Sequence, residues 1–364
     1  MCFKKVTISP LFCRLRCDDS EFATLNEASK ETRLKAHEFL PTTQHPNHQA
    51  RRLWTSSKLC SALTTAATWA LILGLLGGCA TASRNPTTPG RPHAIVLMTD
   101  FGEFDGAVSA MRGVAHGVAP QTPIYDLTHQ IPPYDIWSGA YRLKQTVKYW
   151  PPGTVFVNVV DPGVGTTRKS VALETLSGHI LLGPDNGLFT LVAEDLGLKR
   201  VVNIEESRQR LKGSEESYTF HGRDLYAYVG ARVASGQVEL EQLGERLPDV
   251  KRLDYQRAAI RGSRVVGMIP VLDPMYGNVW SNIPKSMVES WRQGRAKIKV
   301  VIKKSGRQVW RGEVPIVETF GGVPEGQALA YYNSLLDFSV ALNMRNFAAQ
   351  HKISSGPDWT IELE

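Results

Sequence analysis

The chain has 364 residues, 42% of them hydrophobic and 21% charged, a balance typical of a globular protein that can bury a core. The net charge of +7 is uneven, because residues 1–79 hold ten Lys or Arg against six Asp or Glu, which leaves 32 against 29, or +3, in the remainder. All five cysteines also lie in residues 1–79. A nucleic-acid partner, a disulfide and a thiolate metal site are therefore not expected after residue 79.

A charge-free apolar stretch at residues 59–78 follows Lys58 and ends in Leu-Gly-Gly before Cys79. A basic start, an apolar core and small residues before a cleavage point are typical of a secretory signal. The ending resembles the lipobox of bacterial lipoproteins, so we expect a signal peptide at 59–79 and lipidation of Cys79. An uncleaved membrane-spanning anchor and a buried helix are the alternatives.

Residues 1–58 precede this signal, although a secretory signal should begin a chain. We interpret them as a leader that is disordered, or untranslated because the start codon was assigned too early. Residues 80–92, rich in Pro, Ser and Thr, are expected to be a flexible linker. These assignments predict a protein of the cell envelope, lipid-anchored to the membrane and facing the periplasm; without the signal it would be cytoplasmic.

Residues 93–255 alternate between short apolar runs and helical patterns. Strands are predicted at residues 94–99, 124–127, 155–160, 170–174, 179–182 and 200–204, and helices at 105–118, 136–149 and 223–235. This alternation predicts a layered α/β domain with a mostly parallel sheet.

Residues 256–364 are rich in short β-type runs. Strands are predicted at residues 264–271, 279–283, 296–303, 313–318 and 328–332, followed by a helix at 335–343. This pattern predicts a smaller C-terminal β-barrel domain.

In an open α/β sheet, ligands bind beyond the carboxyl ends of the strands. The loops that follow predicted strands contain residues 99–106, 161–168 and 183–188, each with at least one aspartate. Such a carboxylate can accept both hydroxyls of a ribose. Asp and Asn at these places also serve as N-caps and turn formers, so Asp105 and Asp185 keep both interpretations.

Asp161 and Arg168 lie in one loop, and His221 lies in the sequence Phe-His-Gly-Arg-Asp at 220–224. A guanidinium favours the hydroxide form of a nearby water, an imidazole can take its proton, and a carboxylate can orient both. An ordinary salt-bridge network is the alternative interpretation.

Two other motif matches lack support. Asp100-Phe101-Gly102 has the letters of the kinase magnesium motif, but the other kinase signatures are missing from the sequence. The histidines do not have the spacing of a metal site, so no metal is predicted.

Six motifs follow one another along the chain: TDFG at 99–102 with Asp105 close behind, DPGVGTTR at 161–168, GPDNG at 183–187, FHGRD at 220–224, DPMYGNVWSNI at 273–283 and YYNS at 331–334. In order and approximate spacing they resemble the S-adenosylmethionine hydroxide adenosyltransferases, the hydrolytic relatives of the bacterial fluorinase and chlorinase. The resemblance covers residues 94 to about 345.

This resemblance implies hydrolysis of S-adenosylmethionine to adenosine and methionine, without a metal or redox cofactor. It also implies an α/β domain followed by a β-barrel, in a homotrimer whose active sites lie between subunits. The catalytic residues that it implies are Asp161, Arg168 and His221.

The resemblance further implies a set of substrate contacts: Asp100 and Tyr134 at the ribose, Asp105 and Ser334 at the methionine end, and Asn278 and Phe320 at the adenine. Leu335 and Leu336 stand where the fluorinase has arginine and glycine, so recognition of the methionine carboxylate stays open.

The chemistry agrees with this assignment. A sulfonium is already an activated leaving group, so the enzyme need only place a water in line and remove its proton. We expect Arg168 and His221 to hold the water or hydroxide while Asp161 orients them. Halogenating relatives have tyrosine at the position of Asp161, whose negative charge would repel a halide, so hydrolysis is favoured over halide transfer.

Export would separate the enzyme from S-adenosylmethionine, which is a cytoplasmic metabolite. A non-enzymatic lipoprotein that binds adenosine or another nucleoside is therefore a second hypothesis. A metal-dependent hydrolase that uses the same carboxylates is a third, and a halide-using adenosyl transferase remains a rival within the family.

Overall fold

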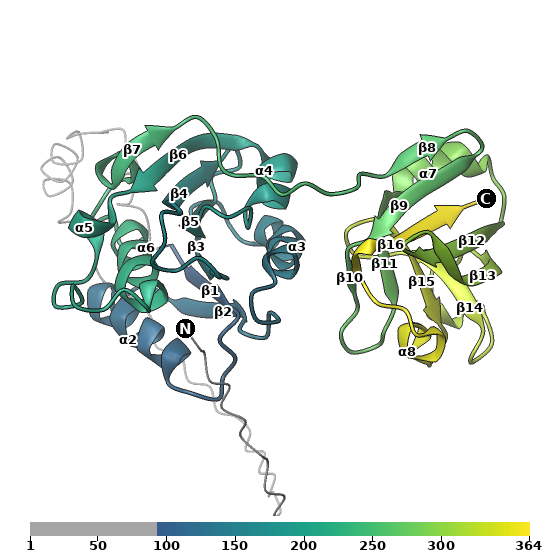
Figure 1. The fold of residues 1–364 in the computed structure, drawn as a ribbon, viewed down its shortest axis with the longest axis horizontal. Helices are drawn as coiled ribbons and strands as arrows, with labels where there is room; N and C mark the ends of the chain where they lie inside the picture. Colours follow the sequence, from purple (N-terminus) through teal and green to yellow (C-terminus); the bar gives the residue numbers. More distant parts are fainter. Residues whose placement is uncertain (1–92) are drawn as a thin grey trace, which may run out of the picture. The chain divides into compact units, whose positions relative to one another are not determined.

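The computed structural model describes residues 93–364, which comprise an α/β part and a β-rich part (Figure 1). The leader, signal peptide, lipidated cysteine and linker predicted for residues 1–92 lie outside the described residues. Within residues 93–364, no helix has both the length and the hydrophobicity needed to cross a bilayer.

A seven-stranded sheet with the order β2-β1-β3-β5-β4-β6-β7 forms the centre of the α/β part. Its strands are β1 Ile95–Thr99, β2 Ile124–Thr128, β3 Val155–Val159, β4 Ser170–Thr175, β5 Ile180–Pro184, β6 Leu198–Ile204 and β7 Gly244–Leu247. The pairs β2·β1, β1·β3 and β3·β5 are parallel, whereas β4 is antiparallel to both β5 and β6, and β7 is antiparallel to β6. Most strands therefore point the same way, as predicted.

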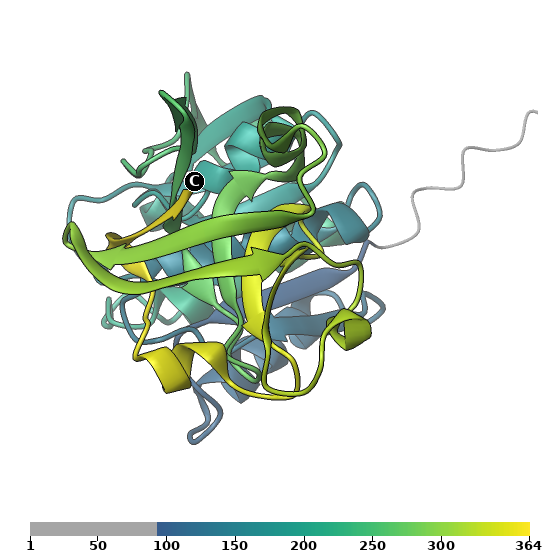
Figure 2. The same ribbon diagram turned by 90° about the vertical axis from the view of Figure 1, so that its right-hand side faces the viewer.

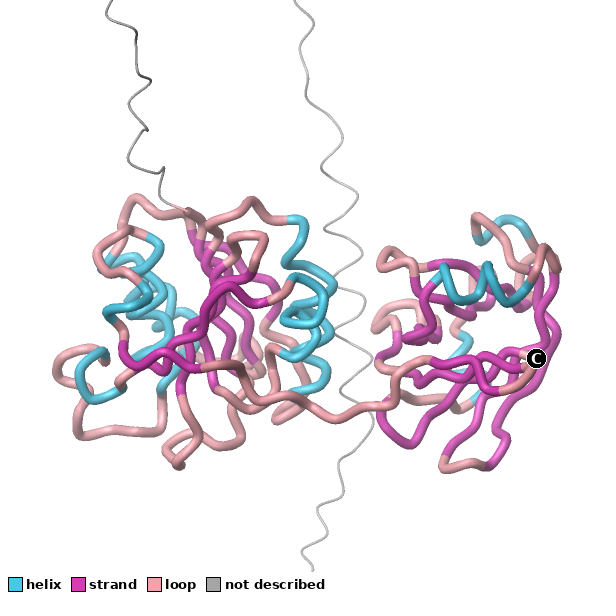
Figure 3. The backbone as a smooth tube through the Cα atoms, turned by 90° about the horizontal axis from the view of Figure 1, so that it is seen from above, coloured by secondary structure: helices cyan, strands magenta, loops and turns pink. Residues whose placement is uncertain are grey.

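Helices cover both faces of this sheet (Figures 1 and 3). They are α2 Ala107–Val118, α3 Ile136–Thr146, α4 Thr190–Leu196, α5 Glu206–Gln209 and α6 Tyr228–Ala234, with short turns η1 Val147–Tyr149, η2 Gly222–Ala227 and η3 Leu240–Gln242. All five residues of β1 are buried. Its alternate side chains enter two separate cores, Ile95 and Leu97 on the side of α2 and α6, Val96 and Met98 on the side of α3 and α4.

Local chemistry explains the position of two of these helices. Asp135 precedes α3 and accepts the backbone N–H of Ser138 at 2.9 Å, which caps the helix. Gly230 lets α6 approach the sheet, because a Cβ at this position would lie 2.5 Å from Cγ2 of Val157.

The predicted strands and helices of residues 93–255 all find counterparts in the structure. The helix predicted at 223–235 differs in its first part, where η2 is a π-helix, a form often found at functional sites. Strand β7 and the single turn α5 were missed, because such short polar segments have no clear periodicity.

The β-rich part contains two antiparallel sheets, ordered β10-β11-β15-β14 and β13-β12-β16-β9-β8 (Figure 2). Their strands are β8 Ala259–Arg261, β9 Arg264–Ile269, β10 Val271–Leu272, β11 Val279–Pro284, β12 Lys297–Lys304, β13 Arg307–Pro315, β14 Ala328–Tyr332, β15 Asp337–Leu342 and β16 Gly356–Leu363. Helices α7 Lys285–Arg292 and α8 Phe347–His351 and the turn η4 Phe320–Gly322 connect strands.

The prediction of a C-terminal β-barrel is correct only as far as the β-rich character, since the strands described here pair into two sheets and not into one closed barrel. The two sheets bury their apolar faces in one shared core, to which β11 and β15 contribute Val279 and Phe338 and β9 and β12 contribute Val265 and Ile298. Stacking two sheets buries those faces without closure.

The helix predicted at residues 335–343 is wrong. Residues Asp337–Leu342 form β15, an interior strand between β11 and β14, and every residue of this strand is buried. In so short a segment, apolar side chains mixed with the polar Asp337 and Ser339 fit a helix as well as a strand, and the pairing with β11 and β14 decides the outcome.

Candidate active site

A cavity at the carboxyl ends of β1 and β3 gathers much of the predicted site. The two strands are adjacent and parallel, so Asp100 and Asp161, which follow them, leave the sheet at the same edge. The cavity has a volume of about 280 Å³ and is lined by Asp100, Phe101, Pro133, Tyr134, Val159, Asp161, Val164, Thr219, Phe220, His221 and Gly222. The predicted residues Asp100, Tyr134, Asp161 and His221 are thus brought together.

Arg168 binds Asp161 but is not among the residues that line the cavity. Its Nε lies 3.0 and 2.9 Å from the two carboxylate oxygens of Asp161, and its Nη2 lies 2.5 Å from Oδ2. The side chains are only 10% and 4% exposed. Burial alone would disfavour the guanidinium charge, but the hydrogen bonds to Asp161 and the neighbouring negative charge raise the pKa of Arg168 above its ordinary value.

Glu206, the first residue of α5, joins Arg168 to the histidine. Its Oε1 accepts from Nη1 of Arg168 at 3.0 Å and from the Ser170 hydroxyl at 2.6 Å, and its Oε2 lies 2.9 Å from Nε2 of His221. Burial opposes its ionisation, but the hydrogen bonds from His221 and Ser170 and the adjacent charges lower the pKa of Glu206 to about 2. The sequence did not indicate this residue, because Glu206 belongs to no motif and stands beside another glutamate, Glu205.

His221 is 2% exposed and stands at the start of the π-helix η2. Its Nε2 contacts Glu206, whereas its Nδ1 is buried and has no hydrogen-bond partner among residues 93–364. The next residue, Gly222, has little space for a side chain, since a Cβ there would lie 3.2 Å from the Phe101 ring and 3.3 Å from Sδ of Met111.

Asp100 organises the opposite side of the cavity. Its Oδ2 accepts the backbone N–H of Tyr134 at 2.8 Å. Tyr134 has φ = +68°, which costs a non-glycine residue about 1 kcal/mol or more, so this hydrogen bond helps to hold a strained turn. Burial raises the pKa of Asp100, the backbone hydrogen bonds oppose the rise, and the charge of Asp161 adds to it.

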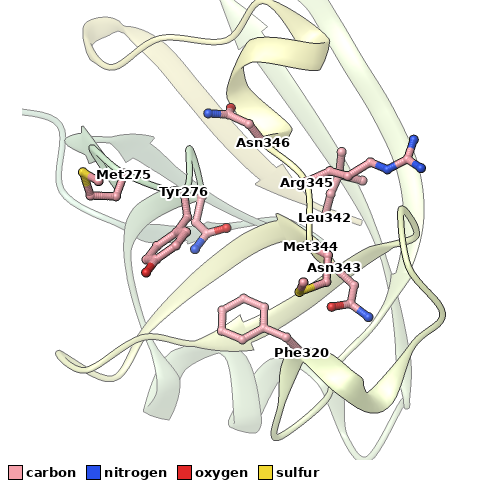
Figure 4. Close-up of a pocket in the computed structure, with 9 residues that line it drawn as sticks. Met275, Tyr276, Phe320, Leu342, Asn343, Met344, Arg345 and Asn346 are labelled. Atoms are coloured by element: carbon pink, nitrogen blue, oxygen red, sulfur yellow. The ribbon is translucent and has the colours of Figure 1, made fainter. Parts of the chain in front are cut away.

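Asn278 and Phe320 line a different cavity, in the β-rich part. This cavity has a volume of about 500 Å³, and its walls are Met275, Tyr276, Asn278, Phe320, Leu342, Asn343, Met344, Arg345 and Asn346 (Figure 4). Between the lining residues Tyr276 and Asn278, Gly277 has φ = +65°, and a Cβ there would lie 1.9 Å from Oδ1 of Asn346, so only glycine fits. The Phe320 ring is 42% exposed, and its centroid lies 4.9 Å from that of Tyr331.

Asp105 and Ser334 are placed outside both of these cavities as the described residues form them. Asp105 accepts the N–H of Ala107, two residues on, at 2.8 Å just before α2, which is the turn-forming alternative. Ser334 is exposed in the turn between β14 and β15. Asp185 also has a structural contact, since its Oδ1 accepts the N–H of Lys251 at 2.7 Å.

Within residues 93–364, no three His, Cys, Asp or Glu side chains gather in a group that could hold a metal ion. The acidic side chains of the site are instead directed at a guanidinium and an imidazole.

Comparison with known proteins places this geometry in a family. Residues 95–244 match the SAM hydroxide adenosyltransferase N-terminal domain, and residues 267–360 match the C-terminal domain of the same family. The chain belongs to the SAM hydroxide adenosyltransferase family. The prediction made from the six motifs is confirmed.

Relatives of two named activities are similar to this chain. The (R)-S-adenosyl-L-methionine hydrolase of Thermus thermophilus is 34% identical over 68% of this chain and 91% of its own length. That of Methanocaldococcus jannaschii is 41% identical over 53% of this chain and 68% of its own length. A fluorinase of Nocardia brasiliensis is 29% identical over 74% of this chain and 97% of its own length.

A solved structure of an uncharacterized protein from Thermotoga maritima has a similar fold. It matches with a TM-score of 0.68 and 30% identity, over 74% of this chain and 99% of that protein. The SAM hydroxide adenosyltransferase family thus accounts for the α/β part and the β-rich part together.

The lowered pKa of Glu206 predicts a pH-dependent contribution to stability. Because this pKa falls from 4.5 to about 2 on folding, the contribution is fully present above pH 4.5 and is lost as the pH falls towards 2. At neutral pH we expect E206Q to lower the free energy of unfolding by at most about 3.5 kcal/mol, since the pKa falls by about 2.5 units at ~1.4 kcal/mol per unit. The difference from the wild type should shrink on acidification.

Urea denaturation at a series of pH values measures this difference. E205Q is the control, because Glu205 is about half exposed and pairs only with Arg208 on the surface, at 3.1 Å. A difference between the wild type and E206Q that stays constant from neutral pH to acid would contradict the prediction.

Proposed function

We propose that the protein hydrolyses S-adenosyl-L-methionine to adenosine and L-methionine. The observation that carries this proposal is that a buried imidazole, His221, and the Asp161 carboxylate line one cavity, in a chain of this family. Relatives 34 to 46% identical to this chain are named (R)-S-adenosyl-L-methionine hydrolase.

The reaction needs a base and a water in line, but no acid for the leaving group. The oxygen of water forms a bond to the ribose C5′ while the C5′–S bond breaks. The electron pair of the C5′–S bond goes to sulfur, and methionine leaves as a neutral thioether. The water gives up one proton. A partly closed cavity favours this reaction, because the attacking oxygen and the sulfonium neutralise each other in the transition state.

The geometry supports a division of roles among the three predicted catalytic residues. His221 takes the proton of the water, and Asp161, which lines the same cavity, orients that water. Arg168 hydrogen-bonds to Asp161 but does not itself line this cavity. Its role in this proposal is thus to position charge and not to grip the water itself.

The substrate contacts are assigned from both cavities. Asp100 and Tyr134 bind the ribose, Asn278 reads the adenine edge, and Phe320 stacks on the adenine ring. The methionine end is assigned to Asp105 and Ser334, which remains a proposal from the motif match.

A homotrimer with its active sites between subunits would bring the first cavity of one subunit against the second cavity of another, so that each cavity forms one half of an active site, here called a half-site. The two cavities share no lining residue. Large apolar side chains are exposed in each part, among them Phe104 at 101% and, around the second cavity, Met275 at 80% and Met344 at 83%. Exposed apolar groups of this kind are typical of surfaces that contact another molecule.

Water is favoured over a halide as the nucleophile. The carboxylate of Asp161 lines the cavity where the nucleophile would approach, and its charge would repel chloride or fluoride. The fluorinases among the relatives are 25 to 29% identical to this chain.

The location of the protein is a separate proposal from the sequence. The signal at residues 59–79 and a lipidated Cys79 would anchor the enzyme to the membrane, facing the periplasm. The substrate would then have to reach it by leakage or uptake.

Incubation of the full chain with S-adenosyl-L-methionine should release adenosine and methionine in equal amounts, as measured by liquid chromatography. A chelator should leave the rate unchanged, since the proposed chemistry uses only side chains. Added chloride should give no 5′-chlorinated nucleoside. Chelator-sensitive release, a halogenated product, or tight adenosine binding without turnover would each contradict the proposal.

Removal of the base should separate chemistry from binding. We expect H221A and R168A each to lower kcat at least about 100-fold. H221A removes the base, and R168A removes the group that positions Asp161. Both variants should still bind adenosine, as measured by calorimetry. The matched control is H116A, since His116 is exposed in the last turn of α2. Full activity in both H221A and R168A would refute the assignment.

The intersubunit site can be tested by complementation. H221A removes the proposed base from the first cavity, and N278A removes the proposed adenine contact from the second. Each variant alone should therefore be inactive. Mixed trimers should regain about one quarter of wild-type activity, because each half of a site is intact with a probability of about one half. Mixtures that stay inactive although mixed trimers form, as shown by two affinity tags, would place both half-sites within one subunit.

A further inference from the structure

The surroundings of His221 assign a role to a residue that none of the motifs contains. We propose that Glu206 is a positioning residue that holds the proton of His221 on Nε2 and thereby leaves Nδ1 as the base. This inference rests on the proposed function, since it specifies how the imidazole of that site accepts a proton.

The two nitrogens of the His221 ring have opposite surroundings. Nε2 lies 2.9 Å from Oε2 of Glu206. Nδ1 is buried and has no hydrogen-bond partner in the described part of the chain, although the residue lines the cavity. Buried polar atoms are rarely left without a partner, so an unpaired nitrogen in a residue that lines a cavity indicates a place for a ligand atom.

The contact with Glu206 decides which nitrogen carries the proton. An ionised carboxylate only accepts hydrogen bonds, and the pKa of Glu206, lowered to about 2, keeps this group ionised at neutral pH. Nε2 must therefore be the donor. In the neutral ring Nδ1 then has a free electron pair, which is the form a general base needs.

Glu206 cannot turn away from this contact without losing others. Its Oε1 is held by Nη1 of Arg168 at 3.0 Å and by the Ser170 hydroxyl at 2.6 Å, and Ser170 in turn lies 2.8 Å from the Tyr226 hydroxyl. Arg168 is itself anchored by Asp161. One chain of contacts thus connects Asp161, Arg168, Glu206 and His221.

The proton balance of the step follows from this arrangement. A water O–H proton passes to Nδ1 as the oxygen bonds to C5′ and the C5′–S electron pair goes to sulfur. The ring then carries protons on both nitrogens, and the Glu206 carboxylate stabilises this imidazolium. Release of the Nδ1 proton to solvent restores the starting tautomer.

The same contacts predict an unusual effect of the isosteric change E206Q. Arg168 and Ser170 direct donors at the Oε1 position, so the glutamine oxygen must face them and its NH₂ group must face His221. The amide would then donate to Nε2, and the proton of the neutral ring would move to Nδ1. E206Q therefore inverts the tautomer with almost no change in shape.

Nitrogen NMR of the ¹⁵N-histidine-labelled full chain measures the tautomer directly. Wild-type His221, assigned by its absence from H221A, should be protonated on Nε2 with an acceptor-type Nδ1, and E206Q should show the reverse. We expect E206Q to lower kcat about 10²- to 10⁴-fold with little change in KM for S-adenosyl-L-methionine and in adenosine binding. E205Q, at the neighbouring exposed glutamate, should match the wild type in both measurements.

A wild-type His221 that is protonated on Nδ1 would overturn the proposal, whatever happens to the variants. So would an E206Q enzyme with the kcat of E205Q. The wild-type spectrum reports the tautomer of His221 whether or not the protein turns over substrate. A protein with the Nε2–H tautomer that does not release adenosine would therefore refute the proposed function but not the tautomer assignment. Even if E206Q does not fold, the wild-type spectrum decides between the two tautomers.

Discussion

The placement of one guanidinium between two carboxylates organises the site. Arg168 contacts Asp161 in the loop after β3 and Glu206 at the start of α5, and the imidazole of His221 contacts the far oxygen of Glu206. Charges buried to this degree are costly unless each has partners of the opposite sign, and removal of one partner leaves the other unpaired. The network therefore ties the loop after β3, the turn α5 and the start of the π-helix η2 to one another beside the cavity.

This constraint explains why few groups suffice for the chemistry. The sulfonium already provides the leaving group, so the protein must supply only position, a base and a site with restricted access to solvent. In the proposed mechanism, the Asp161 carboxylate that orients the water would also repel a halide. A single negative charge would then serve both catalysis and the choice of nucleophile.

Much of the architecture could be predicted from periodicity. The β1 and β3 strands are continuous apolar runs because helices cover both faces of the sheet, and Asp135 and the glycines mark where elements begin or approach one another closely. The prediction failed at β15, because a short segment that mixes apolar residues with Asp337 and Ser339 fits a helix as well as a strand. It also failed at the barrel, since closure depends on how edge strands pair and not on local pattern.

By itself, the sequence determined which chemistry the protein can carry. The order of six motifs identified the family, and the residue types at Asp161, Arg168 and His221 indicated proton removal from water. Only the tertiary structure showed that Glu206 joins this group, that Arg168 does not line the first cavity, and that Asn278 and Phe320 belong to a second cavity. The physical reason is that residue type defines acidity and hydrogen-bonding capacity, whereas the pairing of side chains distant in sequence is decided by the packing of the elements that carry them.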